Sequence, residues 1–336
     1  MTDSEENPVL FCQRISANPL IFYSAPNEHS RLGIAEFVSP LVAQTPAVFL
    51  IALWWSYDDD ESVLNIVKAY RPWQLQYPLH SLVVLCNTAG QVQRFGKYGM
   101  QCMLANHNIF LDESVFKPLD SENRTFDAVY NAGLTPFKRH NLCTAVPSLA
   151  LLYGRWHDAI DKTGRYPNEV KAMLPNALFV NEALRPGEYV QLLPVECAQW
   201  YNRARVGLCL SAKEGAMNTS MEYLMSGLPI VSTPSDGGRD LFFDDETCLI
   251  VEPTPQAVAD GVRAMIARDL SPVFVRQKVL EKVRRHRQSF MALLRLIFAK
   301  LGAPYPGDDA LWNSFFVNKM IRPIRRRQLR DLVFFG

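Results

Sequence analysis

Short, continuously apolar segments alternate with helical patterns along most of this sequence. Strands this apolar are typical of parallel sheets that are covered on both faces. Strands alternating with helices predict an α/β fold of doubly wound parallel sheets. The predicted strands are 20–24, 47–54, 82–86, 126–131, 177–181, 206–211 and 228–233. The main predicted helices are 139–153, 189–204, 219–226 and 255–267, followed by a long basic amphipathic helix at 275–300.

The chain has 336 residues, enough for about two domains with packed cores. A polar stretch at 118–124 separates two groups of predicted strands. We therefore expect one Rossmann-like domain at 1–124 and a second at 125–300. Residues 301–336 would pack back on the first domain as a C-terminal helix.

Composition excludes several classes of protein. The net charge of +1 gives no general reason to expect a nucleic-acid partner. Residues 1–6 are acidic and do not resemble a secretion signal, and the longest apolar run, 48–55, is too short to cross a bilayer. The seven cysteines are scattered without C-x-x-C spacing, which favours free thiols in a reducing compartment. We expect a cytoplasmic protein without a membrane-spanning segment.

The segment 206–231 (VGLCLSAKEGAMNTSMEYLMSGLPIV) contains the most informative pattern. A buried strand ends at Ser211, a short loop follows, and a helix runs from Thr219 to the residue before Gly227. Open parallel sheets bind ligands at the carboxyl ends of their strands. A helix N-terminus there presents free N–H groups and a positive dipole end, which suit a diphosphate.

Two acidic residues, Glu214 and Glu222, flank this turn with seven residues between them. The arrangement resembles the signature of the retaining group-1 glycosyltransferases of the GT-B fold. That signature is an apolar strand, Ser, Glu-Gly, a second Glu and Gly-x-Pro before the next strand. It occurs here as Ser211, Glu214-Gly215, Glu222 and Gly227-Leu228-Pro229-Ile230-Val231. Further segments that resemble the family are 33–38, 106–118, 130–139, 237–240 and 248–253.

The resemblance implies a GT-B fold, in which two Rossmann-like parallel-sheet domains face a cleft. The 125–300 domain would hold a nucleotide-sugar donor, and the 1–124 domain would meet a glycan or lipid-linked acceptor. The implied activity is a retaining sugar transfer without a metal or a separate cofactor. The implied setting is the assembly of surface polysaccharide or lipopolysaccharide.

The resemblance also implies roles for individual residues. Glu222 would accept hydrogen bonds from the donor ribose, and Glu214 would contact the donor sugar near the reacting centre. Lys138 and Arg139 would neutralise the leaving diphosphate. Two cations at a predicted helix start oppose the helix dipole, so an anion between them would relieve that conflict. The remaining predicted donor-binding residues are Gly33, Gly215, Asn218, Thr219 and Ser220.

Some features leave alternatives open. Gly133 stands where the family has an arginine, which puts the donor class in question. Thr219 and Glu222 also have the spacing of a capping box. Two other functions fit the same fold: a nucleotide-sugar epimerase or hydrolase, and a scaffold that binds a glycan or nucleotide sugar without turnover.

The C-terminal segment 322–335 is basic and then apolar: RPIRRRQLR at 322–330 precedes Leu332, Val333, Phe334 and Phe335. A polybasic segment with apolar neighbours can dock on an anionic membrane surface. The same pattern also fits a terminal helix that packs on the first domain with its arginines in solvent.

Overall fold

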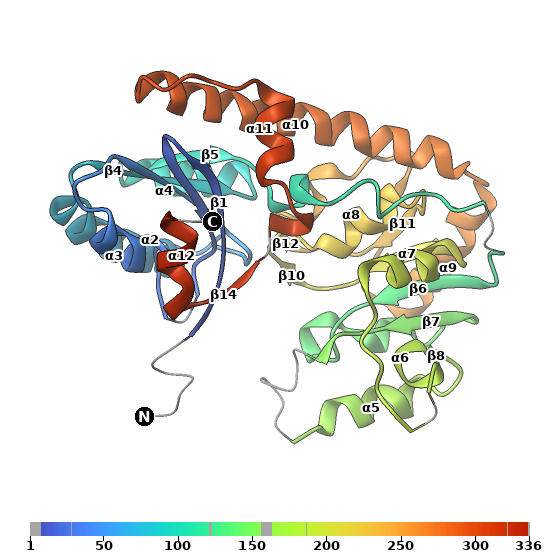
Figure 1. Ribbon diagram of the computed structural model, residues 1–336. Helices are drawn as coiled ribbons and strands as arrows, with labels where there is room; N and C mark the ends of the chain where they lie inside the picture. The colour runs from blue at the N-terminus through green and yellow to red at the C-terminus, as the bar shows by residue number, and fades with distance from the viewer. Residues whose placement is uncertain are drawn as a thin grey trace. The chain divides into compact units, whose positions relative to one another are not determined.

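The computed structural model describes residues 8–27, 29–120, 123–155, 163–185, 187–320 and 322–334. The acidic N-terminal residues 1–6 lie outside the described residues. The chain divides into two compact units: unit 1 comprises residues 1–111 and 284–336, and unit 2 comprises residues 112–283. Each unit is built around its own six-stranded sheet (Figure 1).

The sheet of unit 1 has the strand order β14-β1-β2-β3-β4-β5. Strands β2 to β5 are parallel, whereas β1 and β14 extend the sheet in antiparallel fashion. The strands are β1 Val9–Ala17, β2 Leu20–Ser24, β3 Ala47–Ala52, β4 His80–Cys86, β5 Gln101–Leu104 and β14 Pro323–Arg325. The α-helices are α2 Ala35–Val38, α3 Asp60–Gln76, α4 Ala89–Lys97, α11 Asp308–Phe315 and α12 Leu329–Phe334, with the second half of α10 Pro272–Lys300. The sequence did not predict β1, because Gln13 and Arg14 interrupt its apolar pattern.

Aromatic packing on β3 and α3 dominates the core of unit 1. The Phe49 ring lies 5.5 Å from Phe22 and 5.8 Å from Trp73, measured between centroids. The indole Nε1 of Trp73 donates to Ser39 Oγ at 3.0 Å, and His80 Nδ1 lies 2.9 Å from the same oxygen. The polar atoms of this aromatic core are therefore paired with each other, as buried polar groups require.

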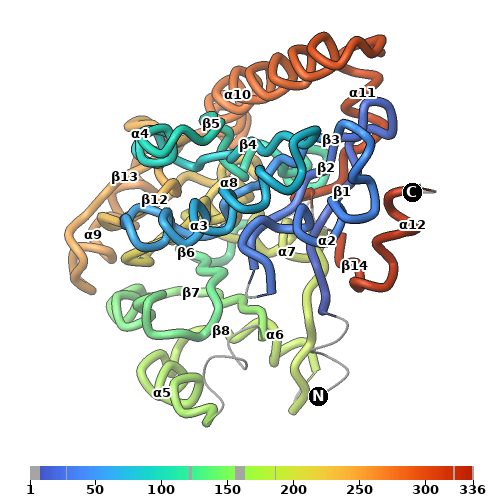
Figure 2. The backbone as a smooth tube through the Cα atoms, turned by 90° about the vertical axis from the view of Figure 1, so that its left-hand side faces the viewer, coloured from blue at the N-terminus to red at the C-terminus, as the bar shows by residue number. Residues whose placement is uncertain are grey.

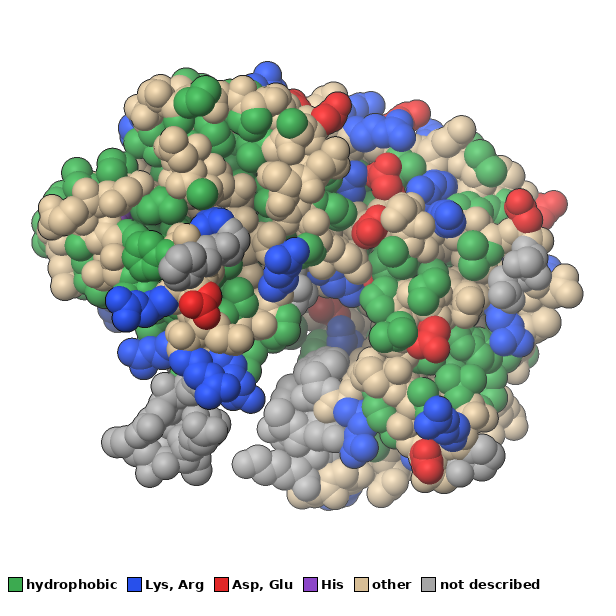
Figure 3. Space-filling model, in the orientation of Figure 1, with side chains coloured by type: hydrophobic (Ala, Val, Ile, Leu, Met, Phe, Trp, Pro, Cys, Tyr) green, Lys and Arg blue, Asp and Glu red, His purple; other side chains and the backbone are tan. Residues whose placement is uncertain are grey.

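The C-terminal segment folds back on unit 1. Strand β14 pairs with β1, and α12 packs against α2 and β1 (Figure 2). Leu329 and Val333 are buried in the unit 1 core, whereas Arg325, Arg326 and Arg330 are exposed. Lys and Arg side chains gather around the lower end of α12 in the space-filling view (Figure 3). The segment packs on unit 1 as a strand and short helices, where the sequence predicted a single C-terminal helix, and the basic side chains remain accessible.

The sheet of unit 2 is parallel throughout, with the order β13-β11-β9-β6-β7-β8. Numbered along the unit this is 6-5-4-1-2-3, the order of a dinucleotide-binding Rossmann sheet. Its strands are β6 Phe126–Asn131, β7 Leu149–Leu152, β8 Leu178–Phe179, β9 Ala204–Cys209, β11 Ile230–Ser232 and β13 Cys248–Ile250. Its α-helices are α5 Arg165–Met173, α6 Val180–Ala183, α7 Pro194–Asn202, α8 Asn218–Met225, α9 Pro255–Ala267 and the first half of α10. A small parallel pair, β10 Lys213–Glu214 and β12 Asp236–Gly237, lies outside this sheet.

The predicted helix at 139–153 is wrong. Arg139 adopts the left-handed conformation with φ of 51°, which ends any helix passing through it. A single 3-10 turn, His140–Cys143, follows, and 149–152 forms the buried strand β7. The predicted helix at 189–204 is shorter than expected: α7 begins at Pro194, a residue suited to the first helical position.

The unit boundaries lie at 111/112 and 283/284, where the sequence indicated 124/125 and 300/301. Within unit 2, Leu119 N donates to Asn202 Oδ1 at 2.8 Å, so the stretch before β6 belongs to this unit. Within unit 1, the Arg287 guanidinium donates to the carbonyls of Ile109 and Leu111, both at 2.7 Å. The second half of α10 is therefore part of unit 1.

Gly207 on β9 offers a test of packing in unit 2. A Cβ at this position would lie 2.3 Å from the ring of buried Tyr223 on α8. We expect Gly207→Ala to lower the free energy of unfolding by about 1–3 kcal/mol through overpacking. Gly96→Ala is the control, because nothing lies within 4 Å of its Cβ; the helix α4 should gain up to about 1 kcal/mol. Urea denaturation of both variants measures this, and an unchanged Gly207→Ala midpoint would contradict the packing.

Candidate active site

The loop after β9 is positioned by its pairing with the loop after β11. Strand β10 carries Glu214 and lies parallel to β12, with Glu214 opposite Gly237. Gly238 N donates to Gly215 O at 2.7 Å. Gly237 has φ of +105°, and a Cβ there would lie 1.7 Å from Glu214 O. Only glycine permits this approach of the two chains, so Gly237 fixes the backbone that presents Glu214.

The structure brings Glu214 and Lys138 together. Lys138 lies in the 3-10 turn Pro136–Lys138 after β6, and its ammonium pairs with Glu214 Oε1. Both residues are buried, at 5% exposure for Glu214 and 8% for Lys138. β6 and β9 are the neighbouring strands at which the strand order of unit 2 reverses. The pair therefore lies beyond the carboxyl ends of both strands, where Rossmann sheets bind ligands.

Arg139 does not occupy the predicted helix start. Its Nε donates to Leu210 O at 2.5 Å, and its Nη2 donates to Thr233 Oγ1 at 2.7 Å and to Pro234 O at 3.3 Å. Burial lowers the pKa of this guanidinium from its usual range. The prediction that Lys138 and Arg139 together oppose a helix dipole is wrong, because 3-10 turns on either side of a left-handed residue replace the helix.

Sequence reasoning missed Arg239. Its side chain is fully buried and donates to three carbonyl oxygens: Cys209 at 3.0 Å, Ser211 at 3.0 Å and Thr233 at 2.6 Å. It also pairs with Asp240 at 2.6 Å. Arg239 thus ties the end of β9 to the end of β11. The available signal was an arginine directly after two glycines and before an acid, within the segment 237–240.

Glu222 lies on α8 and belongs to a buried hydrogen-bond chain. Tyr201 OH donates to Glu222 Oε2 at 2.6 Å, and Asn131 Nδ2 donates to Tyr201 OH at 2.6 Å. Burial and the nearby Glu222 raise the pKa of Tyr201 well above its usual value, so its phenol stays protonated. The capping-box alternative is wrong: the residue before the helix is Met217, with φ of 51°, and Thr219 is already inside α8.

The first turn of α8 contains the remaining predicted donor-binding residues of unit 2. Ser220 is buried, and its hydroxyl donates to Met217 O at 2.8 Å. Asn218 Oδ1 is buried and has no partner among the described residues. Gly215 lies in the loop that leads into the helix. Because the first N–H groups of a helix lack intrahelical acceptors, this turn can receive an anion.

Gly33 belongs to unit 1, so the structure does not join it to the site in unit 2. It has φ of +59°, and a Cβ there would lie 2.2 Å from Ser24 Oγ. The same Ser24 oxygen accepts from Ile34 N at 3.1 Å. Gly33 therefore shapes the loop after β2. Gly133, where the resembled family has an arginine, is buried in the loop after β6.

Among the described residues, no group of three or more His, Cys, Asp or Glu side chains is arranged to hold a metal ion. Within the same residues, no helix is long and apolar enough to cross a membrane.

The comparisons with known proteins agree with this geometry. The sequence model of the family described as "Glycosyl transferases group 1" matches residues 164–268, which include Glu214, Glu222 and Arg239. No curated protein matches the sequence. The sucrose-phosphate synthase of Thermosynechococcus elongatus is similar in structure, with a TM-score of 0.58 and 15% identity over 84% of this chain and 74% of its own. The crystal structure of TarM has a TM-score of 0.54 and 14% identity over 84% of this chain and 55% of its own.

The family match and the structural similarity cover different parts of the chain. Residues 164–268 match the group 1 glycosyltransferase family, and the two Rossmann-like units have the GT-B fold.

The buried pair of Lys138 and Glu214 predicts a strong coupling in stability. Lys138→Met leaves a buried carboxylate without its cation, and we expect a loss of about 3–5 kcal/mol. Combining it with Glu214→Met should recover most of that loss, because no unpaired charge remains. Urea denaturation of the double-mutant cycle measures the coupling.

The exposed pair of Arg165 and Glu169 on α5 is the control for that cycle. Arg165→Met should cost less than about 1 kcal/mol. Simple addition of the two single losses in the Lys138/Glu214 double variant would show that the pair is not coupled.

Proposed function

We propose that this protein is a glycosyltransferase that moves a sugar from a nucleotide-sugar donor to a glycan or lipid-linked acceptor. Unit 2 binds the donor at the carboxyl ends of β6 and β9. The observation that carries the proposal is the buried pair of Glu214 and Lys138 beyond the switch point of a Rossmann sheet. A buried ion pair is costly to desolvate and is a weak means of stabilising a fold, which favours a role in ligand chemistry.

Lys138 is the cation that neutralises the leaving phosphate. Negative charge builds on that phosphate as the glycosidic bond breaks, and a fixed buried cation lowers the barrier more than one in water would. An ammonium has three donors, so Lys138 can contact Glu214 and a phosphate oxygen together. The Arg139 guanidinium donates to Leu210 O, Thr233 Oγ1 and Pro234 O, so we assign it no role at the leaving phosphate. The second source of positive potential at that phosphate is the first turn of α8.

Glu222 holds the donor ribose. The hydrogen bond from Tyr201 fixes the orientation of its carboxylate. An ionised carboxylate has about four acceptor positions, so Glu222 can also accept from a pair of ribose hydroxyls. Glu214, on the loop between β9 and α8, contacts the sugar that is transferred.

The finer parts of the proposal come from the resemblance to retaining group-1 enzymes. They are retention of configuration, catalysis without a metal, and a place in surface-polysaccharide or lipopolysaccharide assembly in the cytoplasm. The exposed arginines 322, 325, 326, 327 and 330 support peripheral contact with an anionic membrane. Lys138 and the α8 N-terminus would supply the positive charge that a metal provides in other transferases.

Nucleotide binding tests the donor site. We expect one of UDP, GDP, ADP or CMP to raise the melting temperature, because a ligand that binds only the folded state stabilises it. Glu222→Gln should lower the affinity for that nucleotide by roughly 10- to 100-fold, because the charge-assisted hydrogen bonds to the ribose are lost. A deoxyribose analogue is the control and should bind the wild type and the variant more equally. If no nucleotide binds, the donor site is not in unit 2.

Turnover separates the proposed transferase from its alternatives. Glu214→Gln should bind the donor within a few-fold of the wild type and transfer sugar at least about 100-fold more slowly. Product analysis with and without acceptor measures this. Free or epimerised sugar formed without acceptor would indicate the hydrolase or epimerase, and donor binding with no turnover in the wild type would indicate the scaffold.

A further inference from the structure

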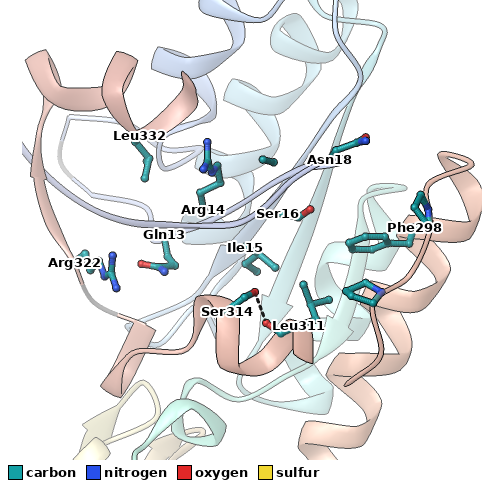
Figure 4. A pocket seen from close by; sticks show the side chains of 13 residues that line it. Gln13, Arg14, Ile15, Ser16, Asn18, Phe298, Leu311, Ser314, Arg322 and Leu332 are labelled. Carbon is teal, nitrogen blue, oxygen red and sulfur yellow. Dashed lines mark hydrogen bonds between the residues drawn. The ribbon is translucent and has the colours of Figure 1, made fainter. Parts of the chain in front are cut away.

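A pocket lies wholly within unit 1 and shares no residue with the candidate donor site. Its volume is about 480 Å³, inside the range of about 300–1,000 Å³ typical of small-molecule sites. Strand β1 contributes residues 13–17 to it, and the end of α10, the following loop, α11 and the C-terminal segment supply the other walls (Figure 4). Strand β14 pairs only with Val9, Leu10 and Phe11, so the pocket lies where β1 continues beyond its partner.

The lining of this pocket is cationic. Arg14 and Arg322 line it, and no Asp or Glu does. Arg14 Nη1 donates to Val333 O on α12 at 3.0 Å, and Figure 4 shows its side chain on the opposite side of β1 from Gln13 and Ile15. Arg322 is exposed, and among the described residues no acid pairs with either arginine. The Arg322 guanidinium, on the same side of β1 as Gln13 in Figure 4 and without an acid partner, favours a ligand that carries a carboxylate or phosphate.

Gln13 adds a buried hydrogen-bond acceptor. Its side chain is 5% exposed, and its Nε2 donates to Phe315 O at 2.7 Å. Its Oε1 is buried and has no partner among the described residues. Reversing the amide would place oxygen against the Phe315 carbonyl, so this orientation is fixed. An unpaired buried carbonyl is costly, and it calls for a ligand hydroxyl or N–H group.

The opposite wall is apolar. Figure 4 shows Phe298 and Leu311 across the pocket from Gln13 and Arg322, with Ile15 between them. Phe298 and Leu311 are buried, at 2% and 4% exposure. An apolar wall facing hydroxyl-binding and anion-binding groups suits the two kinds of surface of a sugar ring, its C–H face and its polar edge.

We propose that this pocket is a second saccharide site, which binds a sugar carrying one carboxylate or phosphate. Arg322 binds the anionic group, Gln13 Oε1 accepts from a hydroxyl, and the ring lies on the side of Phe298 and Leu311. The choice of a saccharide rests on the proposed glycosyltransferase function. The site is separate from the donor site, so an acidic part of the acceptor or of the product can be held by unit 1 alone.

Calorimetric titration of the full chain tests this proposal. The probes are glucuronic acid, glucose 6-phosphate, neutral glucose and inorganic phosphate. We expect at least one of the two anionic sugars to bind, and glucose and phosphate to bind at least about tenfold more weakly, because each lacks half of the recognised chemistry. Arg322→Glu should lower the affinity for the anionic sugar at least about tenfold.

Arg330→Glu is the matched control. It makes the same change of charge on an exposed arginine of the same segment, outside the pocket lining. Its affinity for the anionic sugar should stay within about twofold of the wild type. Nucleotide binding is measured on the same samples, so a failure here is distinguishable from a failure of the donor site.

Three results would overturn the proposal. Neither anionic sugar binds at about 10 mM; phosphate binds as tightly as glucose 6-phosphate; or Arg330→Glu weakens binding as much as Arg322→Glu. A fifth titration uses a Glu-rich peptide. Its binding in place of the sugars would make the open edge of β1 a strand-docking surface and would likewise reject the saccharide site.

Discussion

The candidate donor site depends on two arginines that bind backbone carbonyls. Arg239 and Arg139 donate to the carbonyl oxygens of Cys209, the last residue of β9, of Leu210 and Ser211 directly after it, and of Thr233 and Pro234 after β11. Carbonyls at the ends of parallel strands have no further strand to pair with, and burying them unpaired is costly. The guanidinium groups satisfy them and hold the two strand ends together. The loops that follow can then pair as β10 and β12 and present Glu214.

The sequence predicted what depends on local pattern. Helix α9 has the bounds that were predicted, 255–267, and α8 begins one residue before its predicted start. The spacing of a strand, a loop and a helix singled out Glu214 and Glu222, and the structure places Glu214 in β10 after the end of β9 and Glu222 within α8. Their chemical roles remain predictions, since geometry alone does not show what a carboxylate binds.

The errors arose where a few residues overrule a longer pattern. The apolar spacing at 139–153 also fits a helix, but one left-handed residue, Arg139, directs the chain into a turn and then into β7. The pairing of Arg139 and Arg239 with carbonyls 6 to 95 residues away along the chain is a tertiary property. A basic residue that satisfies buried carbonyls and one that binds a phosphate have the same appearance in sequence, and only the contacts distinguish them.

Unit 1 is discontinuous along the chain, and this has a consequence for its synthesis. Its sheet edge is completed by β14, and its core includes Leu329 and Val333, which the ribosome adds more than 200 residues after β5. Domains generally fold as units while the chain emerges. Unit 2 is continuous and can therefore reach its native structure first, while the β1 edge and the apolar surface beneath α12 await their partners. During that interval the nascent chain exposes an unpaired strand of unit 1. Chaperones that bind such surfaces would therefore act on unit 1, because unit 2 is already folded.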